Sequence, residues 1–192
     1  EVITLPFIDV DNAKIRAIYE DHNQNLWIGC YHRGMVMVSK ESTPFHFWSV
    51  PIREYPQAGV ITALYKDDDG HIVSGVEGEG VFKITSEGNI TDHLFSGKTV
   101  SSIYKDYSGN LWFGGYYSGL YMQDAKGNVR FMLPEIKLKD IKKITGDDKG
   151  NLYLSLFGSG FIRYHLPTQT VTEYQSSSGG LRNNWIYTLL LD

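Results

Sequence analysis

The stretch KDYSGNLWFGGYYSGLY, residues 105–121, decides the fold of this 192-residue chain. It opens with an Asp–Tyr–Ser–Gly turn, continues into an aromatic-rich segment, and reaches a second short loop that ends at Gly119. Asp and Gly favour tight turns, and alternating apolar residues between turns are typical of short strands. The stretch therefore predicts a β-hairpin rather than a helix or an active-site loop.

The same pattern occurs four times along the chain. The turn aspartates are separated by 46, 39 and 41 residues, and the glycines that end the second loop repeat the same intervals. The two series are Asp21, Asp67, Asp106 and Asp147, and Gly34, Gly80, Gly119 and Gly160. Two independent anchors that keep one varying spacing indicate a true internal repeat.

Each repeat contains four short alternating segments and no convincing helical period, which is typical of a propeller blade of about 40–45 residues. We predict an all-β fold: a β-propeller fragment with four complete four-stranded blades plus flanking partial-blade strands, forming one segment over residues 1–192. The expected blades are residues 15–50, 60–95, 100–133 and 141–175, and the expected partial blades are residues 1–6 and 184–192. Because the fourth blade has its own outer strand near residues 170–175, we interpret the chain as part of a larger propeller.

Composition excludes several classes of partner. A net charge of −4 argues against nucleic acid, since phosphate binding needs concentrated Lys and Arg. No apolar run approaches the roughly 18 residues that span a bilayer, so we expect no membrane insertion of this segment. The single cysteine, Cys30, rules out an intrachain disulfide and a cysteine-based zinc cluster.

Three of the repeats resemble the two-component regulator propeller repeat, roughly I-x-E-D-x-x-G-N-L-W-I-G-T-x-x-x-G-L. They are EDHNQNLWIGCYHRGM (20–35), KDYSGNLWFGGYYSGLY (105–121) and DDKGNLYLSLFGSGF (147–161), and GGLRNNWIYTLLLD (179–192) resembles the lead-in to a further blade. The second repeat departs from the pattern at His71 and Val73. The first has Gln24 where Gly is usual, so we expect its turn to be altered.

The resemblance implies a biological setting that composition and spacing do not. The family is similar to the extracytoplasmic sensor region of hybrid two-component systems, especially those of gut Bacteroidetes. It implies a periplasmic location in an inner-membrane protein, an oligosaccharide or other small glycan as ligand, and self-association through the parent sensor. It implies no cofactor.

The turns themselves favour a structural role over a metal site. Asp accepts backbone N–H bonds across such a turn, and Gly permits a positive φ. DDDG at 67–70 and DDKGN at 147–151 are rich in oxygen, but calcium takes six or more oxygen ligands, usually including a bidentate Glu, and none is suitably spaced. We therefore predict no metal site.

No sequence motif indicates catalysis. The six His residues are scattered over different segments, and the chain has no H-E-x-x-H motif, no nucleophile elbow and no P-loop. We predict no catalytic residues, so the chain is not an enzyme on its own. A propeller lyase stays open as an alternative, because a His and a carboxylate from different blades can converge. The other alternative is a scaffold propeller that has no ligand site of its own.

The loops between the second and third segments of each repeat, residues 31–33, 77–79, 116–118 and 157–159, vary strongly while their flanks repeat. This is typical of a site carried on a scaffold. The predicted ligand-binding residues, which include Arg182 from the last blade connection, are Tyr31, His32, Arg33, Glu77, Glu79, Tyr116, Tyr117, Phe157 and Arg182. Aromatic rings can stack on sugars, and charged groups can bind hydroxyls or a uronate; the alternative is that these aromatics cap blades or form an interface. Trp27 and Trp112 occupy the same position of the repeat, so we expect both in the core. Trp185 does not occupy that position and is free to lie at the surface or in an interface.

Overall fold

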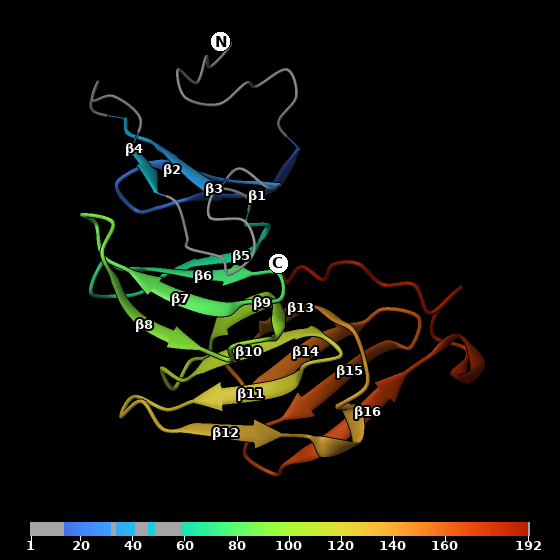
Figure 1. Cartoon of the computed structure of the whole chain (residues 1–192). Coiled ribbons are helices and arrows are strands. Elements are labelled where there is room, and N and C mark those ends of the chain that lie inside the picture. The colour runs from blue at the N-terminus through green and yellow to red at the C-terminus, as the bar shows by residue number, and fades with distance from the viewer. Residues whose placement is uncertain (1–13, 32–33, 41–45, 49–58, 192) are drawn as a thin grey trace. The chain divides into compact units, whose positions relative to one another are not determined.

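The structure is a computed structural model that describes residues 14–31, 34–40, 46–48 and 59–191. Its described strands form four antiparallel four-stranded sheets, which can be followed by their labels in Figure 1. The chain divides into two compact units, Glu1–Gly97 and Lys98–Asp192, and each unit contains two of the sheets. The predicted all-β architecture of four-stranded propeller blades is confirmed.

Unit 1 contains blades 1 and 2, each a meander in which neighbouring strands follow one another in sequence. The strands of blade 1 are β1 (Ile15–Glu20), β2 (Leu26–Cys30), β3 (Gly34–Val38) and β4 (His46–Trp48). The strands of blade 2 are β5 (Ile61–Lys66), β6 (Ile72–Val76), β7 (Gly80–Ile84) and β8 (Ile90–Leu94). Sequential antiparallel pairing needs only short turns, which the Asp- and Gly-rich segments supply.

Unit 2 contains blades 3 and 4 with the same strand order. The strands of blade 3 are β9 (Thr99–Lys105), β10 (Leu111–Tyr116), β11 (Gly119–Gln123) and β12 (Val129–Met132). The strands of blade 4 are β13 (Ile141–Gly146), β14 (Asn151–Leu156), β15 (Gly160–His165) and β16 (Thr170–Tyr174). Two single-turn 3₁₀ helices, η1 (Pro134–Ile136) and η2 (Ser176–Ser178), follow the outer strands of these blades.

The hydrophobic core of each unit lies at the seam between its two blades. In unit 1, Trp27 and Met35 from blade 1 pack in one cluster with Ile61 and Phe82 from blade 2. In unit 2, Trp112 from blade 3 belongs to a cluster that is otherwise formed mainly by aliphatic side chains of blade 4. The prediction that the repeated Trp residues are core residues is confirmed, since Trp27 is 4% and Trp112 2% exposed.

Every first strand carries the same irregularity close to its start. The pairing of β1 with β2 passes from Ile15 to Ala17 and skips the residue between them. The same skip occurs in β5, β9 and β13. The skipped residues are Arg16, Thr62, Ser101 and Lys142. A bulge of this kind bends the strand and redirects the side chain of the extra residue.

The flanking partial blades are the remaining part of the predicted architecture. Residues 1–6 lie outside the described residues. Residues 184–191 form no strand with the described part of the chain, and the partial blade expected at 184–192 stays a prediction. This segment is held instead by a hydrogen bond from the Gly160 amide to the Asn184 carbonyl (3.0 Å) and by ring contacts to Phe157. Among the described residues, no helix is long and apolar enough to cross a bilayer.

Candidate functional site

The Asp turns close one end of each blade by an internal hydrogen-bond network. In blade 3, Asp106 Oδ1 accepts the amides of Ser108 and Asn110, both at 2.9 Å, and Oδ2 accepts Asn110 Nδ2 at 3.0 Å. The indole Nε1 of Trp112 donates to the same Oδ2 at 2.7 Å. The geometry of this turn therefore depends on an acid–Trp pair six residues apart, which the sequence pattern did not indicate.

The other turns keep this arrangement with different donors. In blade 1, Trp27 Nε1 donates to Asp21 Oδ2 at 3.0 Å, and in blade 4 the Tyr153 hydroxyl donates to Asp147 Oδ2 at 3.3 Å. Blade 2 has Val73 at this position, and Asp67 Oδ2 pairs with Lys83 Nζ at 2.7 Å instead. In each case the second carboxylate oxygen receives a donor from the blade itself.

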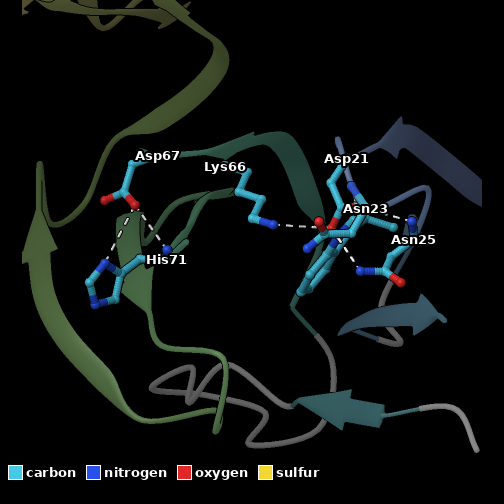
Figure 2. Close-up of polar contacts among 7 residues, drawn as sticks. Asp21, Asn23, Asn25, Lys66, Asp67 and His71 are labelled. Atoms are coloured by element: carbon cyan, nitrogen blue, oxygen red, sulfur yellow. Dashed lines mark hydrogen bonds and ion pairs between the residues drawn. The ribbon is translucent and has the colours of Figure 1, made fainter. Parts of the chain in front are cut away.

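A further contact of these turns is visible in Figure 2. Lys66 Nζ lies 3.3 Å from Asp21 Oδ2 and so joins the first strand of blade 2 to the turn of blade 1. The expectation that Gln24 alters the first turn is wrong. Gln24 takes the left-handed conformation (φ 62°) of the usual glycine, and its amide donates to the Asp21 carbonyl at 2.9 Å.

The electrostatics of the turns follow from these donors. Burial raises the pKa of Asp21, but hydrogen bonds from Trp27 and Asn25 outweigh this effect and hold the pKa well below its usual range. The pKa of Asp147 is lowered in the same way, with the Asn151 bonds outweighing burial. These carboxylates are therefore structural anions rather than acids or bases poised near neutral pH.

One turn brings together potential metal ligands. Asp67, Asp69 and His71 offer ligand atoms that lie within 4.8 Å of one another. His71 Nδ1 lies 3.4 Å from Asp67 Oδ1, as Figure 2 shows. Asp67 Oδ2, however, is already neutralised by Lys83, and three ligands fall short of the six or more oxygens that calcium takes. The calcium-like sequence thus forms a salt-bridged turn.

The variable loops between the second and third strands lie at the other end of each blade, and they hold most of the predicted site residues. In unit 1, the Tyr31 amide donates to the Lys14 carbonyl at 2.7 Å, and the Glu77 amide donates to the Val60 carbonyl at 2.9 Å. The Glu77 side chain is exposed, and Glu79 is half-buried with its carbonyl oxygen 2.6 Å from His93 Nε2. His32 and Arg33 lie outside the described residues.

In blade 3 the loop presents a pair of tyrosines. Tyr116 and Tyr117 are each 55% exposed, and their rings meet edge to face with centroids 4.4 Å apart. Ser118 beneath them is buried, and its hydroxyl lies 3.0 Å from the Thr99 carbonyl and 2.9 Å from the Tyr116 carbonyl. The backbone is thus pinned while both rings face solvent, a suitable arrangement for stacking on a ligand ring.

In blade 4, Phe157 is half-buried and its amide donates to the Asp140 carbonyl at 2.9 Å. The rings of Trp185 and Tyr187 meet it edge-on, with centroids 4.5 and 4.8 Å away. Arg182 is exposed in the same C-terminal segment. Sequence analysis missed the partnership of Phe157 with Trp185 and Tyr187, because these residues are far apart in the repeat pattern.

The predicted residues are distributed over both units. Tyr31, Glu77 and Glu79 belong to unit 1, and Tyr116, Tyr117, Phe157 and Arg182 belong to unit 2. Within unit 2 the aromatic contacts define two separate groups, the Tyr116–Tyr117 pair and the cluster around Phe157. The convergence of all loops on one ligand stays a prediction.

Comparison with protein families decides the nature of the repeats. The model of the two component regulator propeller matches residues 9–32 and 94–117, which include the Asp turns and second strands of blades 1 and 3. Two segments of the chain thus match the two-component regulator propeller repeat. The resemblance inferred from the turn motifs is thereby confirmed. A search of curated proteins gives no match to the chain.

Several solved structures share the fold of this chain, and the chain covers only part of their own length. The extracellular domain of a protein described as a hybrid two-component system from B. thetaiotaomicron matches with 21% identity and a TM-score of 0.73, over 87% of this chain and 24% of its own. PorZ, a surface component of the type-IX secretion system of Porphyromonas gingivalis, matches with 14% identity and a TM-score of 0.68, over 100% of this chain and 31% of its own.

A third match is a catalytically inactive virginiamycin B lyase from Staphylococcus aureus, with 15% identity and a TM-score of 0.69, over 87% of this chain and 57% of its own. At these identities the similarity establishes the propeller fold. The chain spans about a quarter of the length of the two-component extracellular domain it matches.

Proposed function

We propose that this chain is a non-catalytic segment of the extracytoplasmic, periplasmic sensor region of a hybrid two-component signalling protein, and that its variable loops recognise a carbohydrate-derived ligand. The regulator propeller repeats and the fold shared with a two-component extracellular domain support the sensor role. The observation that carries ligand recognition is the exposed Tyr116–Tyr117 pair, which stands on a loop whose backbone Ser118 holds in place.

The chemistry of this pair suits a sugar. Two rings at right angles offer an apolar face and an edge, and the C–H face of a pyranose packs on such surfaces while the phenol groups bind its hydroxyls. Because the Ser118 hydroxyl fixes the loop, little further ordering is needed when a ligand binds, and affinity benefits from this preorganisation.

A thermal-shift screen of the full chain against neutral and acidic oligosaccharides tests the proposal. We expect at least one glycan to raise the melting temperature, since ligands that bind only the folded state stabilise it. The double variant Tyr116→Ala/Tyr117→Ala should lose this shift. Tyr107→Ala is the matched control, because Tyr107 is also exposed (58%) but lies at the Asp turn of the same blade.

A lack of any shift, or an equal loss in the Tyr107 control, contradicts ligand recognition by this loop. The scaffold alternative, in which the segment supports dimerisation of the parent sensor, then becomes the better account. Sedimentation of the chain over a range of concentrations tests it directly, because a self-associating segment shows a mass that rises with concentration.

The lyase alternative is supported by the fold shared with virginiamycin B lyase. Its test is incubation of the chain with quinupristin, followed by liquid chromatography that separates any product from the starting compound. Turnover that is abolished by Glu77→Ala or His32→Ala would establish a lyase, and intact quinupristin after prolonged incubation contradicts it.

A further inference from the structure

In blades 1 and 4 the residue skipped by the bulge of the first strand lies beside the variable loop. In blade 4 the skipped residue is Lys142, and its ammonium lies 5.2 Å from the centre of the Phe157 ring. In blade 1 the skipped residue is Arg16, and its guanidinium lies 5.0 Å from the centre of the Tyr31 ring. The same cation–aromatic pair thus recurs at the same register in two blades, and only blades 2 and 3 have an uncharged residue, Thr62 or Ser101, at this position.

Blade 4 adds a second cation and a buried counter-ion to this pair. Lys139 Nζ contacts the Ser159 hydroxyl of the variable loop at 3.0 Å. Lys142 Nζ pairs with Asp140 Oδ2 at 2.8 Å, and the Asp140 side chain is only 8% exposed. Because an ammonium has three donors, the pair with Asp140 holds Lys142 in position and leaves it able to bind an anion.

The local charge at this end of blade 4 is positive in a chain that is negative overall. Residues 135–143 contain four Lys residues, one Glu and one Asp, whereas the whole chain has a net charge of −4. Lys139 is exposed and Lys142 has 31% of its side chain exposed, so both remain accessible to a ligand. A concentration of one sign of charge attracts ligands of the opposite sign.

An aromatic surface lies directly beside these lysines. The rings of Trp185 and Tyr187 flank Phe157 and are 60% and 66% exposed. Large exposed aromatic surfaces next to fixed charges are typical of ligand sites rather than of an ordinary solvated face.

We propose that the surface formed by Lys139, Lys142, Phe157, Ser159, Trp185 and Tyr187 binds an acidic sugar. The sugar ring packs on the Trp185 and Tyr187 rings, and its carboxylate or sulfate binds the ammonium groups of Lys139 and Lys142. This inference rests on the proposed recognition of a glycan. It goes further, because it assigns a negative charge to the ligand and places the site on blade 4, apart from the Tyr116–Tyr117 pair of blade 3.

The experiment compares ligands that differ only in charge. Isothermal titration of the full chain uses the galacturonic acid trimer and its fully methyl-esterified form, which keeps the rings but removes the charge. Hydrogen bonds to charged groups are stronger than those between neutral groups, so we expect the acid to bind at least about tenfold more tightly than the ester. A sulfated disaccharide and its desulfated form make up the second arm and distinguish sulfate from carboxylate.

Lys139→Met is the main variant, because Lys139 is exposed and its loss leaves no buried charge unpaired. We expect it to weaken binding of the acid about tenfold and to leave binding of the ester unchanged. Lys143→Met is the matched control, since Lys143 is an exposed lysine on the same segment. This variant should bind the acid as tightly as the unmodified chain does. The double variant Asp140→Asn/Lys142→Met removes the ion pair between these residues at constant net charge. It should weaken binding of the acid and leave binding of the ester unchanged.

Equal affinities for each acid and its neutral form, or unchanged binding by Lys139→Met, overturn the inference. If neutral glycans still bind and Tyr116→Ala/Tyr117→Ala abolishes that binding, the proposed function is supported while the proposed site for an acidic sugar is contradicted. If no glycan of either charge binds, both proposals fall.

Discussion

Single side chains close the turns of this propeller through one shared device, a carboxylate that accepts a hydrogen bond from the strand it precedes. Trp112 donates to Asp106, Trp27 to Asp21 and Tyr153 to Asp147. In blades 1 and 3 the Trp therefore fills the seam between blades and also joins the seam to the turn. This double role explains why the motif couples Asp and an aromatic residue at a fixed separation.

Replacing Trp112 by Phe should destabilise the chain by about 2–4 kcal/mol. The change removes a donor from a buried carboxylate and also removes packing volume from the core. Urea unfolding followed by circular dichroism measures the loss. Tyr153→Phe is the comparison, because it deletes only a hydroxyl with a 3.3 Å bond and should cost about 1 kcal/mol or less. A Trp112→Phe cost as small as that of Tyr153→Phe would contradict the double role.

Gln24→Gly should stabilise the chain by about 0.5–1 kcal/mol. Gln24 has φ 62°, and a left-handed conformation costs a residue with a side chain roughly 1–2 kcal/mol, part of which glycine loses again through its freer unfolded state. The reverse change in blade 3, Gly109→Gln, places a side chain at φ 86° and should destabilise. The two melting temperatures should shift in opposite directions, and a shift of both in the same direction would refute this account.

The packing of neighbouring blades depends on the second strands, where glycine allows close approach. A Cβ on Gly114 would lie 2.8 Å from Ile141 Cγ2 of the next blade, and a Cβ on Gly29 would lie 3.0 Å from Ile61 Cγ2. The seam in unit 2 is further joined by the Ile144 amide, which donates to the Ser102 hydroxyl at 2.9 Å. The glycine of the repeat therefore sets the distance between blades.

Gly114→Ala should destabilise unit 2 by about 1–3 kcal/mol, because an added methyl group overpacks the seam. Gly180→Ala is the control, since nothing lies within 4 Å of an added Cβ there, and it should change stability by less than about 0.5 kcal/mol. Chemical denaturation of both variants provides the measurement. Similar stabilities of the two proteins would show that the seam can expand without cost.

Considered as a whole, the chain carries a set of structural carboxylates that link its stability to pH. The pKa values of Asp21, Asp67 and Asp147 are lowered because hydrogen bonds, with Lys83 contributing at Asp67, outweigh the effect of burial. Above the ordinary Asp pKa of about 3.9, these groups are ionised in both folded and unfolded states and their stabilisation is complete.

Stability should therefore be constant near neutral pH and fall as the pH drops below about 4–5, because the unfolded chain then binds protons that the folded turns resist. Urea midpoints between pH 3 and pH 7 measure this effect. Asp147→Asn should lower stability at pH 7 and reduce the loss between pH 5 and pH 3. An unchanged pH dependence in this variant would contradict the assignment of the turn carboxylates.

The amino-acid sequence was sufficient for the repeat, the strand order within each blade and the family, because each depends on local spacing of turn and strand residues. It also indicated Tyr116, Tyr117 and Phe157 as candidate site residues, since the loops vary where their flanks agree. The strand expected after residue 184 stays a prediction, because a strand needs a partner that local sequence cannot supply and residues 184–191 pair with no described strand.

Tertiary contacts settle the remaining features. Ile141 and Ile144 are at most 1% exposed at the seam with blade 3, whereas the equivalent Ile15 and Ile18 are 50% and 60% exposed. Identical side chains thus differ in burial according to what packs against them. The bulge that carries Lys142 to Phe157, and the meeting of Phe157 with Trp185, arise in the same way, because they depend on pairing register and on contacts between segments distant in the chain.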